Sequence, residues 1–307
     1  MVEPARGYEL VASFFTLTGA GFGEEPRYGF AQRCRAAAAA GFTGIGLHVD
    51  DLPRTVAAGL DVAAMRALLA ECGLRVVEIE FLGDWALDDS DAAAVERTVS
   101  RIEAVADAFG GRHVSAGEFR GAASLDLDAA AARLDRLAGR LSERGLRVAV
   151  EAFPWSAISG PGVAVELLGR AAAPNLGQLI DVWHFFNGGG DPERLTGPIA
   201  AVQLNDGPRV HGDYLVHARA ARRLPGDGEL AVVDLVRTVL RTGFTGPWCV
   251  EVNTPEFRAL PVDEAARRAA AAARSVLDTA GAPHRPAGLD VGAGPANRTN
   301  RTFGQTY

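Results

Sequence analysis

Short apolar segments rich in β-branched residues recur along the chain, and stretches with a helical pattern of Ala, Leu and Arg separate them. We expect eight strands, at residues 9–15, 43–49, 75–81, 113–119, 147–153, 177–185, 199–206 and 248–253. The clearest helices between them cover residues 30–41, 61–73, 91–110, 127–145 and 230–243. The phrases AAAGFTGIGL, LAECGLRVVEI, LSERGLRVAV and LRTGFTGPWCV repeat one joint, in which a helix ends at Gly and a buried strand follows.

The regular alternation of strands and helices determines the expected fold class. Nearly continuous apolar strands indicate a parallel sheet covered by helices. Eight strand–helix units match the number that closes a single (β/α)8 TIM barrel, an α/β fold. A doubly wound dinucleotide-binding sheet is the alternative, but no G-x-G-x-x-G follows the first predicted strand with an acidic residue about 20 positions later.

The chain has 307 residues, of which 48% are hydrophobic, enough for one large core. We expect the barrel to occupy residues 1–281 as a single catalytic domain. From residue 282 to residue 307 the periodicity is lost and Gly, Pro, Asn and Arg become frequent, which predicts an irregular C-terminal tail. A homo-oligomer is compatible with the sequence, although no segment specifies one.

Charge and cysteine content exclude several classes of protein. The net charge of -7, from 31 Lys+Arg against 38 Asp+Glu, disfavours a nucleic-acid binder, which needs clustered basic residues. Cys34, Cys72 and Cys249 lack C-x-x-C spacing, so neither a disulfide framework nor a thiolate zinc site is indicated. The N-terminus lacks the pattern of a signal peptide, and no apolar stretch reaches the roughly 18 residues of a membrane span. We therefore expect a cytoplasmic protein that binds no membrane.

Polar residues gather at the carboxyl ends of the predicted strands, where a TIM barrel places its active site. They are His48, Asp50, Asp51, Glu80, Asp84, Trp85, Glu118, Glu151, Asp181, His184, Gln203, Asn205, Asp206, Glu251 and Asn253. Four of them lie within otherwise apolar strands, where an unpaired charge would cost several kcal/mol. These four are Glu151, Asp181, Gln203 and Glu251.

Four such groups on four successive strands would converge above the barrel axis. Carboxylates gather only where a cation or a shared proton offsets their repulsion, so the pattern predicts a site for one divalent ion. Oxygen ligands of this kind suit Mn²⁺ or Mg²⁺. The alternative is that some of these carboxylates pair with Arg residues or cap helix N-termini.

Six segments of the chain resemble the xylose-isomerase-like barrel superfamily, and the resemblance extends over roughly residues 9–280. The segments are GFTGIGL, VAVEAFPW, LIDVWHFFNGGGDP, AVQLND, RRLPGDGEL and CVEVNTP. This superfamily includes sugar-phosphate isomerases and epimerases, inosose and 3-dehydroshikimate dehydratases, and type-2 apurinic endonucleases. The linked order of polar residues carries the resemblance, from the Glu of the fifth strand to the Glu of the eighth.

The resemblance implies roles for individual residues. The metal ligands of the superfamily fall on Glu151, Asp181, Gln203 and Glu251. His184 and Arg222 match its substrate-contacting positions, with Arg223 as the alternative to Arg222. The ligand on the seventh strand is commonly His in the epimerases, whereas this chain has Gln203. The resulting all-oxygen set is less suited to zinc, and Gln at this position is expected in some dehydratase branches.

The pattern supports two enzyme functions. The first is a divalent-metal-dependent isomerase or epimerase of a keto sugar or related polyol, with proton transfer through a metal-stabilised enediolate by Glu151 and Glu251. The alternative is a dehydratase, a lyase, that acts on a cyclic keto-polyol such as an inosose or 3-dehydroshikimate. In that reaction His184 would protonate the leaving hydroxyl, although His184 could equally orient Asp181. An apurinic-site nuclease fits less well because its trinuclear zinc chemistry requires many His ligands, and a non-catalytic barrel subunit is a further alternative.

The other polar and aromatic residues near the rim are weaker candidates. His48 is a candidate for contact with a substrate hydroxyl, or else a structural histidine of the rim. Trp85 and Trp183 could form an apolar wall of the substrate pocket or simply pack in the core. His113 lies at the wrong end of its strand for catalysis. The expected ligand is a small polyhydroxylated or keto compound, and the sequence does not specify which one.

Overall fold

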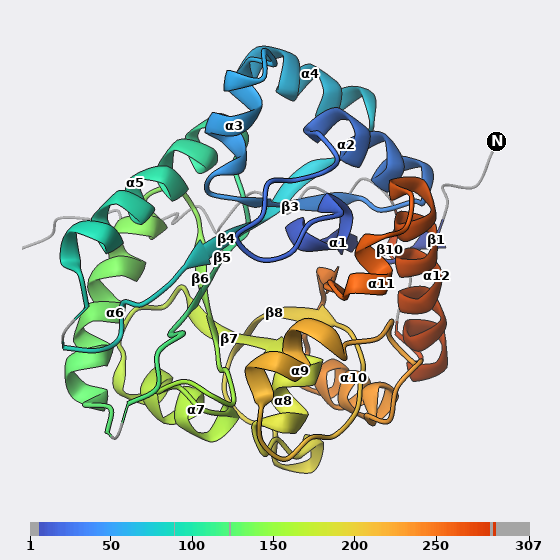
Figure 1. Cartoon of the computed structure of the whole chain (residues 1–307). Helices are drawn as coiled ribbons and strands as arrows, with labels where there is room; N and C mark the ends of the chain where they lie inside the picture. Colours follow the sequence, from blue (N-terminus) through green and yellow to red (C-terminus); the bar gives the residue numbers. More distant parts are fainter. Residues whose placement is uncertain (1–5, 89, 123, 283–284, 287–307) are drawn as a thin grey trace, which may run out of the picture.

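A closed barrel of eight parallel strands forms the centre of the computed structural model, which describes residues 6–88, 90–122, 124–282 and 285–286 (Figure 1). The strands pair in chain order and the last pairs with the first, which closes the barrel. They are β2 (Leu10–Ala12), β3 (Gly44–His48), β4 (Arg75–Leu82), β5 (His113–Gly117), β6 (Arg147–Glu151), β7 (Leu176–Asp181), β8 (Ile199–Leu204) and β9 (Trp248–Val250). The predicted (β/α)8 barrel is confirmed.

Helices surround the barrel and bury its outer face. The longer ones are α2 (Phe30–Ala39), α4 (Val62–Glu71), α5 (Ala92–Phe109), α6 (Leu127–Ser142), α7 (Pro161–Arg170), α10 (Val232–Arg241) and α12 (Val262–Ala280). Shorter helices lie in the segments that follow the carboxyl ends of strands. These are α1 (Phe14–Thr18), α3 (Asp51–Ala57), α8 (Val182–Asn187), α9 (Tyr214–Ala220), α11 (Pro255–Arg258) and the 3-10 helix η1 (Pro192–Arg194). Among the described helices, none combines the length and the apolar composition needed to cross a membrane.

Most of the predicted strands are too long at their carboxyl ends, and two of them extend into helices. The strand predicted at 177–185 ends at Asp181, because the Asp181 carboxylate accepts a hydrogen bond from His184 N and begins helix α8. The strand predicted at 9–15 ends at Ala12, and its last two residues, Phe14 and Phe15, belong to helix α1. Both errors have one cause, since an apolar run does not distinguish a buried strand from a buried short helix.

The loop after β8 is organised around the carboxylate of Asp206. Its Oδ1 accepts hydrogen bonds from Gly207 N at 2.7 Å and Leu230 N at 3.1 Å, and its Oδ2 accepts one from Gly226 N at 3.1 Å. The backbones of Asp206 and Arg223 also exchange two hydrogen bonds, at 2.9 and 2.8 Å. A buried carboxylate with several N–H donors is well satisfied, so this arrangement fixes the segment that carries Arg222.

The first and the last described segments pair with each other outside the barrel. Strand β1 (Arg6–Gly7) pairs antiparallel with β10 (Arg285–Pro286) in a separate two-stranded sheet. Apart from Ala282 and β10, the tail predicted at 282–307 lies outside the described residues, so its irregular character stays a prediction.

Replacement of Gly228 by Ala tests the packing around Asp206. A Cβ at this position would lie 2.2 Å from Asp206 Oδ1 and 2.4 Å from Gly207 N, so the loop would have to move. We expect Gly228→Ala to lower the free energy of unfolding by about 1–3 kcal/mol, measured by chemical denaturation. The matched control is Gly139→Ala in helix α6, where a Cβ meets no atom within 4 Å. That control should gain about 0.5–1 kcal/mol, and an equally stable Gly228→Ala variant would contradict the packing argument.

Candidate metal centre and active site

A pocket of about 410 Å³ opens at the carboxyl ends of the barrel strands and contains most of the predicted site residues. Its polar lining consists of His48, Glu80, Ser115, Glu151, His184, Gln203, Arg219, Arg222 and Glu251. Its aromatic lining consists of Phe15, Phe22, Phe81, Phe119, Phe153 and Trp155. The pocket therefore combines a group of buried charges with an apolar wall, as small-molecule sites generally do.

The four predicted metal ligands come together from four successive strands. Glu151 is the last residue of β6, Asp181 is the last of β7, and Gln203 is paired in register with Asp181 on β8. Glu251 follows β9 directly. All four side chains are buried. The structure thus confirms that these residues share one place, whereas their binding of a metal stays a prediction.

Hydrogen bonds from the following segments orient Asp181. His184 N donates to its Oδ1 at 2.9 Å, and Asn205 Nδ2 donates to its Oδ2 at 2.6 Å. Asn205 in turn accepts a hydrogen bond from Trp183 N through its Oδ1, at 2.8 Å. The carboxylate of Asp181 is therefore held in one orientation by the start of helix α8 and by the residue after β8.

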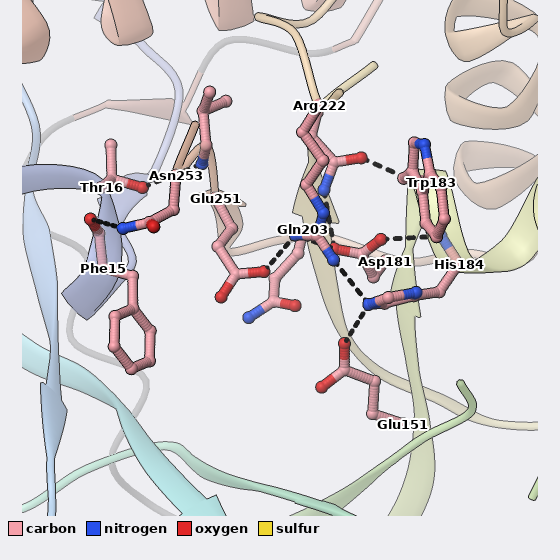
Figure 2. A network of polar contacts seen from close by, with 12 residues as sticks. Phe15, Thr16, Glu151, Asp181, Trp183, His184, Gln203, Arg222, Glu251 and Asn253 are labelled. Atoms are coloured by element: carbon pink, nitrogen blue, oxygen red, sulfur yellow. Dashed lines mark hydrogen bonds and ion pairs between the residues drawn. The ribbon is translucent and has the colours of Figure 1, made fainter. Parts of the chain in front are cut away.

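Arg222 contacts two of the carboxylates and the neighbouring histidine (Figure 2). Its Nη1 lies 2.5 Å from Glu251 Oε2 and 3.1 Å from Asp181 Oδ2. Its Nη2 lies 2.5 Å from His184 Nε2, which is itself 3.8 Å from Glu151 Oε1. Part of the carboxylate charge is therefore paired with Arg, which was the alternative to metal binding that the sequence left open.

One guanidinium does not balance the three carboxylates of this group. Burial raises the pKa of Glu151 well above its ordinary value, and the charges of Asp181 and Glu251 raise it further. Burial also raises the pKa of Asp181, although Arg222 opposes this, and it raises the pKa of Glu251 to about 7. The site thus has an excess of negative charge that protons or a divalent cation can neutralise.

The donor atoms fit a divalent cation. Gln203 donates from Nε2 to Glu78 Oε1 at 3.0 Å, and its Oε1 is buried without a hydrogen-bond partner among the described residues. A buried amide oxygen without a partner is costly unless a ligand or an ion completes it. A carboxylate oxygen of Glu151 and one of Asp181 lie within 4.8 Å of each other. One divalent charge added to three carboxylates and one guanidinium would make the group neutral.

The neutral state of His184 follows from its surroundings. Burial lowers the pKa of His184 well below its ordinary value, and the charge of Arg222 lowers it further. Because Arg222 can only donate, His184 Nε2 must accept, and the ring proton is assigned to Nδ1. His184 is thus a neutral imidazole whose Nε2 lone pair accepts from Arg222.

A second buried polar cluster lies in the barrel interior next to Gln203. His113 Nε2 lies 3.3 Å from Glu78 Oε1, and both side chains are fully buried. Burial would raise the pKa of Glu78, but the hydrogen bond and the charge of His113 outweigh it and bring the pKa to about 2. His113 therefore compensates an interior charge and does not line the pocket, in agreement with its predicted structural role.

The remaining predicted site residues divide into two groups. His48 and Arg222 line the pocket, as predicted, whereas the alternative Arg223 is exposed and donates to Asp227 O. Trp85 and Trp183 do not line it, because both are fully buried in the core between the strands and the helices. The prediction that Trp85 forms part of the substrate pocket is therefore not supported by its position.

Other aromatic residues form the apolar wall that was expected of Trp85. Phe119 and Phe153 stack with ring centroids 5.1 Å apart, and Phe153 and Trp155 stack at the same distance. The Phe153 ring also contacts His184 edge-on, with centroids 4.9 Å apart. Sequence reasoning missed this wall, although Phe153 and Trp155 follow Glu151 by only two and four positions.

Comparison with known proteins gives one family and curated relatives that are 3-dehydroshikimate dehydratases. Residues 34–277 match the family described as a xylose isomerase-like TIM barrel. A 3-dehydroshikimate dehydratase of Pseudomonas aeruginosa is 30% identical over 241 residues, which cover 75% of this chain and 37% of the relative. The chain thus spans well under half the length of that relative.

Two solved structures share the fold at lower identity. A fusion protein of a xylose isomerase-like TIM barrel with a 4-hydroxyphenylpyruvate dioxygenase superposes with a TM-score of 0.75 at 23% identity, over 92% of this chain and 46% of that one. An IolI protein described with a bound zinc atom gives a TM-score of 0.77 at 15% identity, over 88% of this chain and 98% of that one. At these identities the likeness concerns the fold.

Titration with Mn²⁺ tests the ligand set. We expect the wild-type chain to bind one equivalent and to gain thermal stability on binding, because a ligand that binds only the folded state stabilises it. Glu151→Gln removes one charged ligand and should weaken Mn²⁺ binding at least tenfold, measured by calorimetry. The control is Glu166→Gln, on the exposed part of helix α7. Unchanged affinity in Glu151→Gln would refute the assignment of Glu151.

The affinity for the metal should depend on pH. A carboxylate whose pKa is raised holds its proton at a higher pH, and a metal binds only after that proton has left. With the pKa of Glu251 at about 7, affinity should fall about tenfold or more between pH 8 and pH 6. Calorimetry in buffers of different ionisation enthalpy should detect the released protons. Equal affinity at both pH values would contradict the raised pKa.

Proposed function

The chain belongs to the xylose isomerase-like TIM-barrel family, and on that premise we propose that it is a metal-dependent dehydratase of a cyclic keto-polyol of the 3-dehydroshikimate type. Similarity to a 3-dehydroshikimate dehydratase supports the lyase over the isomerase. So does Gln203, which stands where epimerases of the family commonly have His. The activity of the whole protein is part of the proposal, because the chain spans 37% of that relative.

The arrangement of proton-transfer groups carries the choice of reaction. Epimerisation needs two such groups on opposite faces of the substrate, for which the sequence offered Glu151 and Glu251. Glu251, however, is one of the four proposed metal ligands and also pairs with Arg222 at 2.5 Å, so its carboxylate is committed to two other charges. Elimination of water needs only one group that takes a proton and returns it, and His184 Nε2 meets that requirement. This comparison favours the dehydratase, and an isomerase or epimerase is the alternative function.

A divalent ion belongs to this proposal, and its ligands would be Glu151, Asp181, Gln203 and Glu251. When bound, the ion supplies Lewis acidity at the carbonyl and hydroxyl oxygens of the substrate. The oxygen-only ligands favour Mn²⁺ or Mg²⁺ over zinc, which prefers nitrogen and sulfur donors. Asn205 and His184 N hold the Asp181 carboxylate in place for this role.

His184 would carry the proton during elimination. Its neutral Nε2 takes the proton α to the substrate carbonyl and then gives it to the departing β-hydroxyl, so the substrate loses one water and the histidine is regenerated. The substrate must first replace Arg222 Nη2 at this nitrogen. The released guanidinium nitrogen can then donate to a substrate oxygen, as expected for Arg222.

The aromatic wall suits a cyclic substrate. The stacked rings of Phe119, Phe153 and Trp155 form an apolar wall beside His184. A six-membered ring that loses water becomes less polar, so its contact with this wall improves as the reaction proceeds. Such a wall excludes water from the proton-transfer step and gives an acyclic sugar little to bind.

The activity test uses 3-dehydroshikimate with Mn²⁺ in D₂O. We expect the substrate to lose one water and form an aromatic dihydroxybenzoate. Ultraviolet absorbance and mass spectrometry would detect this product. EDTA should abolish the reaction and Mn²⁺ should restore it. If a substrate from a panel of keto-polyols instead incorporates deuterium without losing water, the reaction is isomerisation or epimerisation. Full activity in EDTA would refute the metal-dependent mechanism.

Substitution of His184 tests its proton-transfer role. His184→Asn keeps a polar side chain but removes the titratable base, so kcat should fall by about 10²–10⁴. Mn²⁺ affinity should stay within a few-fold of wild type, since His184 is not among the four proposed ligands. His211→Asn, which changes an exposed histidine, is the matched control and should keep full activity. A kcat within threefold of wild type in His184→Asn would exclude this role.

A further inference from the structure

The amide of Gln203 can face the pocket in either of two ways. Its oxygen and its nitrogen differ in charge, and only the oxygen can ligate a cation. Rotation by half a turn would direct the NH₂ group at the metal position and would remove the ligand. The carboxylates at the other three positions have two equivalent oxygens and do not face this choice. A chain that uses Gln as a ligand therefore needs a hydrogen-bond partner that fixes the orientation of the amide.

In the barrel interior, Glu78 is such a partner. Gln203 Nε2 donates to Glu78 Oε1 at 3.0 Å, while Gln203 Oε1 is buried without a partner among the described residues. The same Glu78 oxygen lies 3.3 Å from His113 Nε2. An ionised carboxylate only accepts hydrogen bonds, so a reversed amide would place its oxygen against the oxygen of Glu78. The contact selects the orientation in which Gln203 Oε1 faces the pocket.

The local sequence makes room for this network. Gly46 lies beside Glu78 in the register of β3 and β4. A Cβ on Gly46 would come within 3.0 Å of Glu78 Oε2 and within 2.9 Å of Glu80 Oε1. The same Cβ would lie 2.8 Å from Phe14 N, so a side chain at this position would force the surrounding groups to move. The absence of a side chain at position 46 thus leaves space for the Glu78 carboxylate. Burial of this charge costs free energy, which suggests that the carboxylate has a role.

We propose that Glu78 and His113 are positioning residues, which hold the Gln203 amide with its oxygen toward the metal. Glu78 accepts from the Gln203 amide, and His113 donates to Glu78 from the other side. Neither residue lines the pocket or belongs to the four proposed ligands. The proposal rests on the proposed function, because it takes Gln203 as a metal ligand. It extends that function from the four ligands to the group that orients one of them.

The test is Mn²⁺ affinity in Glu78→Gln. The new amide can donate to or accept from Gln203, so it no longer selects one orientation, and Mn²⁺ binding should weaken about 10–100-fold. The matched control is Asp51→Asn, which breaks another buried ion pair, with Arg33 at 2.7 Å, away from the pocket. Asp51→Asn should lose thermal stability and keep wild-type Mn²⁺ affinity. An unchanged affinity in Glu78→Gln would overturn the proposal.

A second background separates orientation from a general structural effect. In Gln203→Glu the ligand has two equivalent oxygens, so no orientation needs to be selected. Glu78→Gln added to Gln203→Glu also removes a like charge, and it should leave Mn²⁺ affinity unchanged or increase it. If Glu78→Gln weakens binding equally in both backgrounds, Glu78 is merely structural and the proposal is wrong.

Two further outcomes are decisive. If Glu78→Gln does not fold, His113→Leu is tested instead, because it removes the group that donates to Glu78. His113→Leu should weaken Mn²⁺ binding at least fivefold. Unchanged affinity in this variant would overturn the proposal. If the wild-type chain binds no divalent ion, the proposed metal centre and this proposal fall together. If wild type binds Mn²⁺ and the Glu78 and His113 variants bind equally well, only the positioning role is refuted.

Discussion

Three carboxylates buried at one end of an apolar barrel, with a single guanidinium among them, are the constraint on which the site depends. Glu151, Asp181 and Glu251 are all buried and repel one another, and burial adds to the cost of each charge. Arg222 neutralises part of that charge through Asp181 and Glu251. The rest requires protons or a cation, and this need connects the electrostatics of the site to its chemistry.

Much of the surrounding structure supports this charged group. The loop that carries Arg222 is folded around the Asp206 carboxylate, which accepts three backbone N–H groups. Asn205 and the first turn of helix α8 orient Asp181, and Glu78 holds the amide of Gln203 from below. The proposed ligands are therefore held by hydrogen bonds with neighbouring residues, as preorganised sites require.

The rest of the pocket determines what this group can act on. The aromatic wall lies beside His184 and offers apolar surface to a ring, whereas the charged side is suited to carbonyl and hydroxyl oxygens. His184 is neutral because burial and Arg222 both disfavour its charged form. A neutral base next to a prospective cation site fits removal of a proton α to a carbonyl, which is shared by isomerases and dehydratases. The groups around that base distinguish the two reactions.

The order of apolar segments along the chain was enough to predict eight strands, the barrel and the four residues Glu151, Asp181, Gln203 and Glu251. This was possible because strand periodicity and the burial cost of a carboxylate are local properties. The ends of β2 and β7, the choice of Arg222 over Arg223, and the replacement of Trp85 by Phe153 and Trp155 in the pocket wall depended on packing between distant segments. The contact of Gln203 with Glu78 joins residues 125 positions apart. The closed barrel decides such contacts, because only closure brings the side chains of separate strands to one interior.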